Sequence, residues 1–138
     1  MIRVRIVFYS TLLIVLLSGG CSWHDAATNC DINKGPCTKD TGTAEIIFDI
    51  TPKPVKAMQE LTFTVKIKGG SGADNLIITL GMPGMYMGGN KVIARKSAQD
   101  TYTGKGIIPR CLSGKSLWLA TVETPEDEKA GFLFNVIY

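Results

Sequence analysis

The segment 61–67, Leu-Thr-Phe-Thr-Val-Lys-Ile, alternates strictly between apolar and polar side chains. Successive side chains of a β-strand point to opposite faces, so this pattern predicts a strand with one face buried and the other in water. The segment 46–50 alternates in the same way, with Ile46, Phe48 and Ile50 on one face. Both segments are therefore predicted to be half-buried strands.

Five further segments predict strands: 75–80, 91–96, 101–108, 116–122 and 131–138. Glycine, proline and other turn-forming residues separate all seven segments, and no gap holds a long helical pattern. Seven short strands with regular turns predict an all-β fold, a seven-stranded antiparallel immunoglobulin-like β-sandwich over residues 44–138. The residues expected to face its core are Ile46, Phe48, Ile50, Phe63, Val65, Ile67, Leu76, Ile78, Leu80, Trp118, Ala120, Phe132, Phe134 and Val136.

Residues 1–20 have the pattern of a secretory signal peptide. Arg3 and Arg5 precede an apolar stretch over 6–17, and Ser-Gly-Gly follows it. A permanent transmembrane anchor is the weaker alternative, because the apolar stretch is shorter than the ~20 residues that a membrane-spanning helix needs. The chain is thus predicted to be exported.

Cys21 ends the sequence Leu-Ser-Gly-Gly-Cys, which resembles the lipobox of bacterial lipoproteins. In that family the cysteine is acylated and becomes the mature N-terminus; here Leu17 stands one position further from the cysteine than usual. The resemblance implies a lipid-anchored, periplasm-facing protein of the bacterial cell envelope. Ser22 after the cysteine suggests the outer rather than the inner membrane. An ordinary signal peptide, with Cys21 in a disulfide, is the alternative.

Residues 21–43 are polar, with little apolar periodicity, and are predicted to form a linker. An odd number of cysteines, Cys30, Cys37 and Cys111, remains after the lipid site, in a compartment where thiols oxidise. A turn at Gly35 and Pro36 favours a local Cys30–Cys37 disulfide. Pairing of either linker cysteine with Cys111 is the open alternative.

The sequence Met82-Pro-Gly-Met85-Tyr-Met87 lies in a glycine-rich segment, 81–89, that is expected to be a connection at one end of the sandwich. Thioether sulfur is a soft donor that suits Cu(I), and Cys111 at the same end would add a thiolate. These four residues are the predicted copper ligands. The alternatives are that the methionines fill gaps in a hydrophobic loop or form an apolar contact surface for another envelope protein.

Charge and composition argue against several other functions. From residue 21 onward, 13 Lys and Arg stand against 12 Asp and Glu, a balance of +1, so nucleic acid is not an expected partner. The chain has one histidine, His24 in the linker, and no phosphate-binding loop. Its carboxylates, Asp49, Asp74, Asp100 and Glu123 among them, have no histidine to orient them. No catalytic residue is predicted, and the chain is expected not to be an enzyme.

A set of short motifs resembles the YtkA-like group of bacterial envelope domains, which are related to FixH-type accessory proteins. The motifs are Pro52-x-Pro54 before Leu61-Thr-Phe-Thr-Val, Met82-Pro-Gly-Met-Tyr-Met-Gly, Tyr102-x-Gly104, and Trp118 after a Ser-Gly turn. The resemblance covers 45–138 and implies an exported β-sandwich with a binding or accessory role; some members are linked to copper handling or cytochrome oxidase assembly. It also implies that Met82, Met85 and Met87 are the metal-facing sulfurs. Because the body lacks histidine, Cu(II) is disfavoured.

Overall fold

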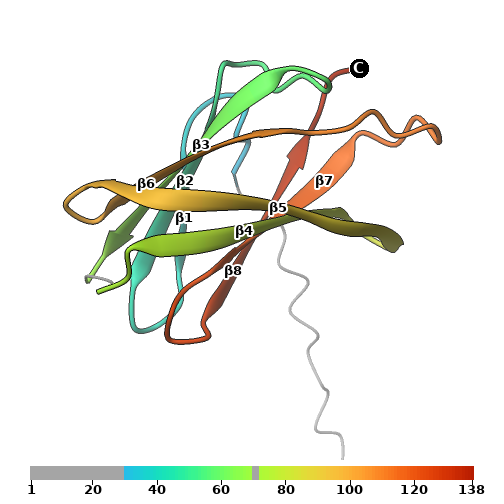
Figure 1. Ribbon diagram of the computed structural model, residues 1–138. Helices are drawn as coiled ribbons and strands as arrows, with labels where there is room; N and C mark the ends of the chain where they lie inside the picture. Colours follow the sequence, from blue (N-terminus) through green and yellow to red (C-terminus); the bar gives the residue numbers. More distant parts are fainter. Residues whose placement is uncertain (1–29, 70–71) are drawn as a thin grey trace, which may run out of the picture.

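The computed structural model describes residues 30–69 and 72–138, in which an antiparallel β-sheet is the dominant structure (Figure 1). The predicted signal peptide, Cys21 and His24 lie outside these residues. Within them, no helix is long and apolar enough to cross a membrane. The strands are β1 (Cys37–Asp40), β2 (Glu45–Thr51), β3 (Glu60–Lys68), β4 (Asn75–Met82), β5 (Met85–Ala98), β6 (Thr101–Ile107), β7 (Leu117–Glu123) and β8 (Lys129–Asn135).

All seven predicted strands are present, which confirms the all-β, antiparallel class. Two details of the prediction differ from the structure. There are eight strands rather than seven, and they form one continuous sheet in the order β1-β2-β3-β6-β5-β4-β7-β8. Strand β1 lies in the segment that was expected to be a linker. It folds onto the body because Ile32 and Cys37 are buried in the core, at 0% and 3% exposure.

The sheet bends sharply between β6 and β5. These strands pair only between 95–98 and 101–103, so the halves β1-β2-β3-β6 and β5-β4-β7-β8 can face each other. Gly104 permits this bend: a Cβ atom there would lie 2.7 Å from the carbonyl oxygen of Ile93 and 2.7 Å from Cγ1 of Val92. In Figure 1, β4 and β5 cross in front of β1 and β2 at a steep angle.

Strands β1 and β8, the two edges of the sheet, are joined by side chains. The ammonium of Lys39 donates to the carbonyl oxygen of Gly131 over 3.4 Å. The carboxylate of Glu128 accepts hydrogen bonds from the hydroxyls of Thr41 and Thr43. These contacts bring the two edges of the sheet together, so the sheet nearly closes on itself.

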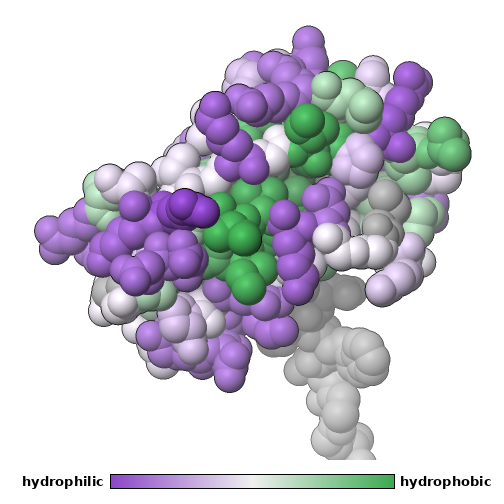
Figure 2. All heavy atoms as spheres, in the orientation of Figure 1, coloured by the Kyte–Doolittle hydropathy of each residue, from purple (hydrophilic) through white to green (hydrophobic). Residues whose placement is uncertain are grey.

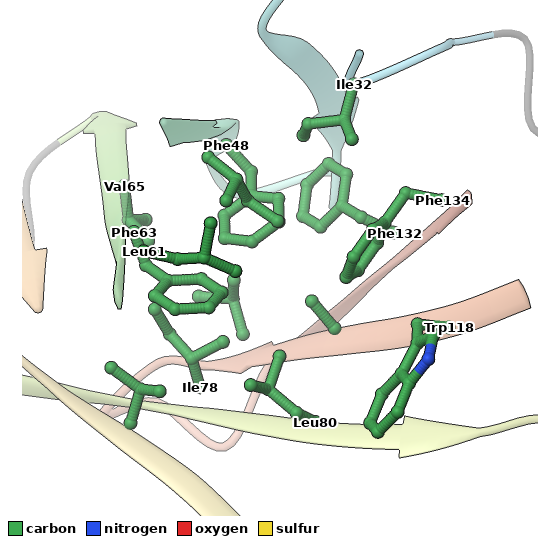
Figure 3. Packing of buried hydrophobic residues seen from close by; sticks show 14 of the residues in the cluster. Ile32, Phe48, Leu61, Phe63, Val65, Ile78, Leu80, Trp118, Phe132 and Phe134 are labelled. Atoms are coloured by element: carbon green, nitrogen blue, oxygen red, sulfur yellow. The ribbon is translucent and has the colours of Figure 1, made fainter. Parts of the chain in front are cut away.

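The core lies between the two halves (Figure 3). The ring of Phe48 stacks on Phe132 from the opposite half, with 5.0 Å between centroids, and lies 6.4 Å from the ring of Phe63. All fourteen residues predicted to face the core are buried. The indole N–H of Trp118 donates to the hydroxyl of Tyr138 over 3.2 Å, which satisfies its one polar atom.

Candidate functional site

The methionine-rich segment is a β-hairpin and not the irregular connection that its glycines suggested. Met82 ends β4 and Met85 begins β5, and the two residues are cross-strand partners. Between them Pro83 and Gly84 form the turn. Gly84 has φ of +73°, a conformation that glycine adopts readily, and proline suits the position before it.

The hairpin turns two of the predicted thioethers toward the core. Met82 is 5% exposed, and Met85 is half-buried and packs against the core cluster. Directly paired residues of an antiparallel ladder share one face, so these two side chains are neighbours. The side chain of Met87 lies outside the described part of the structure. Packing by itself thus accounts for Met82.

Cys111 lies at the same end of the sheet as the hairpin but in a different connection, 108–116, between β6 and β7. Figure 1 shows this connection and the β4–β5 hairpin reaching toward the same side of the molecule, separated from each other. The thiol is free and 7% exposed, and its Sγ lies 2.9 Å from the hydroxyl oxygen of Ser113. Hydrogen bonds from Ser113, together with the nearby Lys115, lower the pKa of this thiol.

The remaining pair of cysteines forms the local disulfide. Cys30 and Cys37 are bonded, with Cα atoms 5.6 Å apart. A turn starting at Asp31, whose carbonyl oxygen accepts from the N–H groups of Lys34 and Gly35, brings them together. The local pairing is confirmed, and the pairing of a linker cysteine with Cys111 is wrong.

The described carboxylates are dispersed. Asp49 pairs with the ammonium of Lys53 at 2.5 Å, and Glu123 pairs with Lys129 at 3.3 Å. Asp74 and Glu123 line the same open hollow of about 500 Å³. Among the described residues, no three His, Cys, Asp or Glu side chains are grouped as a metal site of those ligands would need.

An apolar patch that sequence reasoning missed lies on the outer face of β5-β4-β7-β8. Ile77 and Ile93 are cross-strand partners there and are 40% and 60% exposed. Figure 2 shows hydrophobic residues gathered in the middle of this face, over β4 and β5. We call the patch the outer strip and define it by residues of β4, β5, β7 and β8: Ile77, Thr79, Ile93, Leu119 and Leu133.

A signal for the outer strip is present in the sequence. Its apolar residues occupy positions where strict alternation would place a polar residue. Ile77 lies between the buried Leu76 and Ile78, and Leu119 lies between the buried Trp118 and Ala120. These interruptions of the period-two pattern mark apolar side chains on the solvent face.

A second apolar surface lies at one end of the sheet. It is formed by the β2–β3 loop, the β4–β5 hairpin, the β6–β7 connection and the chain beyond β8. These four segments lie at the same end of the sheet because Glu60 pairs with Ile107, Gly81 with Leu119, and Leu117 with Asn135. We call it the apolar end; its exposed large hydrophobic residues are Met58, Tyr86, Ile107, Leu112, Leu117, Ile137 and Tyr138.

Comparison of the chain with family models, with curated proteins and with solved structures gave no significant match.

Proposed function

We propose that the chain is an exported, lipid-anchored, non-enzymatic accessory protein that binds another protein of an envelope complex through the outer strip. The observation that carries this proposal is the pairing of two exposed isoleucines, Ile77 and Ile93, in the middle of a sheet face. Single exposed apolar residues need no explanation, but a contiguous apolar patch marks a contact surface.

The surroundings of the strip support a protein partner. Thr79 and Thr121 separate Ile77 from Leu119, so methyl groups continue the apolar surface along the sheet. Charged residues on the same face, Lys91 and Arg95 on β5 and Glu123 on β7, border the strip. An apolar centre with a charged border is the usual anatomy of a protein interface.

The proposed localisation in the cell envelope rests on the N-terminal sequence. The signal-like residues 1–20 and the lipobox-like Cys21 support export and acylation, with the outer membrane as the destination. The Cys30–Cys37 disulfide agrees with an oxidising compartment. Membership of the YtkA-like group is part of the proposal. It is supported by the burial of Tyr102 and Trp118 and by the close approach at Gly104.

Site-specific photo-crosslinking in cells tests the proposed contact. A photoreactive residue at position 93 should form a discrete protein adduct, and Ile77→Ser should remove that adduct while leaving the melting temperature unchanged. The same probe at Lys66, an exposed outward position of β3 in the other half, is the matched control. Equal labelling from positions 93 and 66, or no adduct from position 93, refutes the proposal.

Cu(I) binding is a second candidate function, favoured by the cross-strand pairing of Met82 with Met85. Two neighbouring thioethers are soft ligands of the kind that Cu(I) prefers. Titration of the mature chain with Cu(I) against a competing chelator tests it. Binding should be lost when Met82, Met85 and Met87 are replaced by Leu together. It should persist in Met58→Leu, which changes an exposed methionine outside the hairpin. Absence of binding, or binding that survives the triple change, excludes this function.

A further inference from the structure

The apolar end concentrates nearly all the exposed large hydrophobic side chains of the described structure. Seven of the nine lie there, and the other two are Ile77 and Ile93 of the outer strip. Tyr86 is 96% exposed and Leu112 is 103% exposed, the two highest values among them. Both are on projecting connections, so the apolar end presents separate apolar tips rather than a flat patch.

Basic residues accompany these tips. Lys56, Arg110 and Lys115 are exposed at the apolar end, and no carboxylate pairs with them in the described residues. The guanidinium of Arg110 lies 6.0 Å from the centre of the Tyr138 ring. Glu60, an acidic residue at this end, is already paired with Lys105 at 2.8 Å. The apolar end therefore carries an excess of positive charge.

The described chain also begins at this end. The side-chain amide of Asn33 donates to the carbonyl oxygen of Asn135, at the end of β8, and accepts from the backbone N–H of Val55. The disulfide holds Cys30, the first described residue, to Cys37 at the start of β1. Eight residues lie between the proposed lipid site, Cys21, and Cys30, so the two cysteines can be at most about 30 Å apart even when this segment is fully extended.

We propose that the apolar end docks on the surface of an anionic phospholipid bilayer. Tyr86 and Leu112 would enter the headgroup region while Lys56, Arg110 and Lys115 contact lipid phosphates. Apolar tips combined with lysine and arginine are the two features that bind a protein to such a surface. This inference rests on the proposed lipid anchoring, because the short tether then holds the apolar end beside the membrane. The outer strip stays free to bind a protein.

Vesicle co-sedimentation tests the docking without the lipid anchor. The probe is the mature chain from Ser22, produced with a cleavable leader and therefore not acylated. It should bind vesicles containing phosphatidylglycerol more tightly than pure phosphatidylcholine vesicles, and high salt should weaken the binding. The double variant Tyr86→Ser/Leu112→Ser should bind about tenfold more weakly, and so should Arg110→Glu/Lys115→Glu. Ile77→Ser/Ile93→Ser, which also replaces two exposed apolar side chains but on the outer strip, is the control and should bind as the unchanged chain does.

The outcomes separate this inference from the proposed function. Absence of vesicle binding, or equal weakening by the outer-strip variant, overturns the docking. A protein adduct formed from position 112 in cells, in place of vesicle binding, would make the apolar end a protein interface and also overturn it. If the probe at position 93 forms no protein adduct in the otherwise unchanged chain while vesicle binding is intact, the proposed protein contact alone is overturned.

Discussion

The two ends of the sheet present opposite surfaces to solvent. The end opposite the apolar end is formed by the short turns 41–44, 99–100 and 124–128 and by the β3–β4 connection. Its described residues include no exposed large hydrophobic side chain and several acidic ones: Asp74, Asp100, Glu126, Asp127 and Glu128. We call it the polar end.

Backbone geometry explains part of this contrast. At the polar end, Gly42, Asp100 and Asp127 have positive φ values of +91°, +56° and +60°. Glycine and aspartate are the residues that tight turns favour in this conformation, so the turns dictate much of the sequence there. The connections 52–59 and 108–116 at the apolar end are longer. Met58 also has a positive φ, of +59°, but methionine, unlike glycine and aspartate, is not a residue that turns favour in this conformation. The exposed side chains of Met58 and Leu112 are therefore candidates for binding.

The largest expected loss of stability comes from a substitution at Gly104, in the bend that lies between the two ends. Gly104→Ala should lower the free energy of unfolding by about 3 kcal/mol, because the new Cβ would overlap the backbone of β5. Thermal or urea unfolding measures this. Gly89→Ala is the control: it lies at the apolar end with no atom within 4 Å of the added Cβ, and it should be close to neutral. Similar losses for both variants would show that the bend does not depend on Gly104.

The next largest expected loss of stability distinguishes two methionines of the apolar end, Met82 and Met58. Met82 is 5% exposed and Met58 is 70% exposed. Met82→Ala should destabilise the chain by about 2.5 kcal/mol, because it removes core packing and leaves a cavity. Met58→Ala should change stability by less than about 0.5 kcal/mol. Urea unfolding of both variants checks this, and a stable Met82→Ala protein would contradict the core role of Met82.

The sequence predicted most of the fold because alternation reports directly on burial. The pattern of 61–67 located β3, and the fourteen residues assigned to the core are all buried. Strand β1 was missed because Thr38, Lys39 and Asp40 carry no apolar alternation. Its pairing with β2 uses backbone groups, which leave no trace in side-chain type. Its attachment depends on the disulfide and on Ile32.

The candidate site was less predictable. The glycines of 81–89 indicated a connection, but the register shift between Leu80 and Met82 lets the β4–β5 ladder absorb extra residues as an irregularity. Nothing in the local sequence shows that Met82 is buried while Met58 is exposed. The apolar end was missed because its members come from four segments that only the folded topology brings together.

The disulfide at the start of the described chain should contribute less to the free energy of unfolding than the core residues do. Replacing Cys30 and Cys37 together by Ala should cost about 2 kcal/mol, since the bond closes a short loop of the unfolded chain. Cys111→Ala is the matched control and should not remove a cross-link. Unfolding with and without a reducing agent measures both variants. A reductant that leaves the stability of the unchanged protein intact would show that the disulfide does not hold β1.

The smallest expected change in stability concerns Glu128 at the polar end, and it depends on pH. The hydroxyls of Thr43 and Thr41 donate to Glu128 and lower its pKa below the ordinary 4.5. The unfolded chain therefore takes up this proton at a higher pH than the folded chain. The stabilisation is complete above pH 4.5 and is lost as the pH falls through the lower folded pKa.

Melting temperatures measured at neutral and at acidic pH test this. The drop in melting temperature between the two pH values should be smaller for Glu128→Gln than for the unchanged protein. Glu126→Gln, in the same turn, should behave as the unchanged protein does. Because Glu128 links the β7–β8 turn to the residues that follow β1, hydrogen exchange on acidification should rise first where these edges meet, and not at the apolar end.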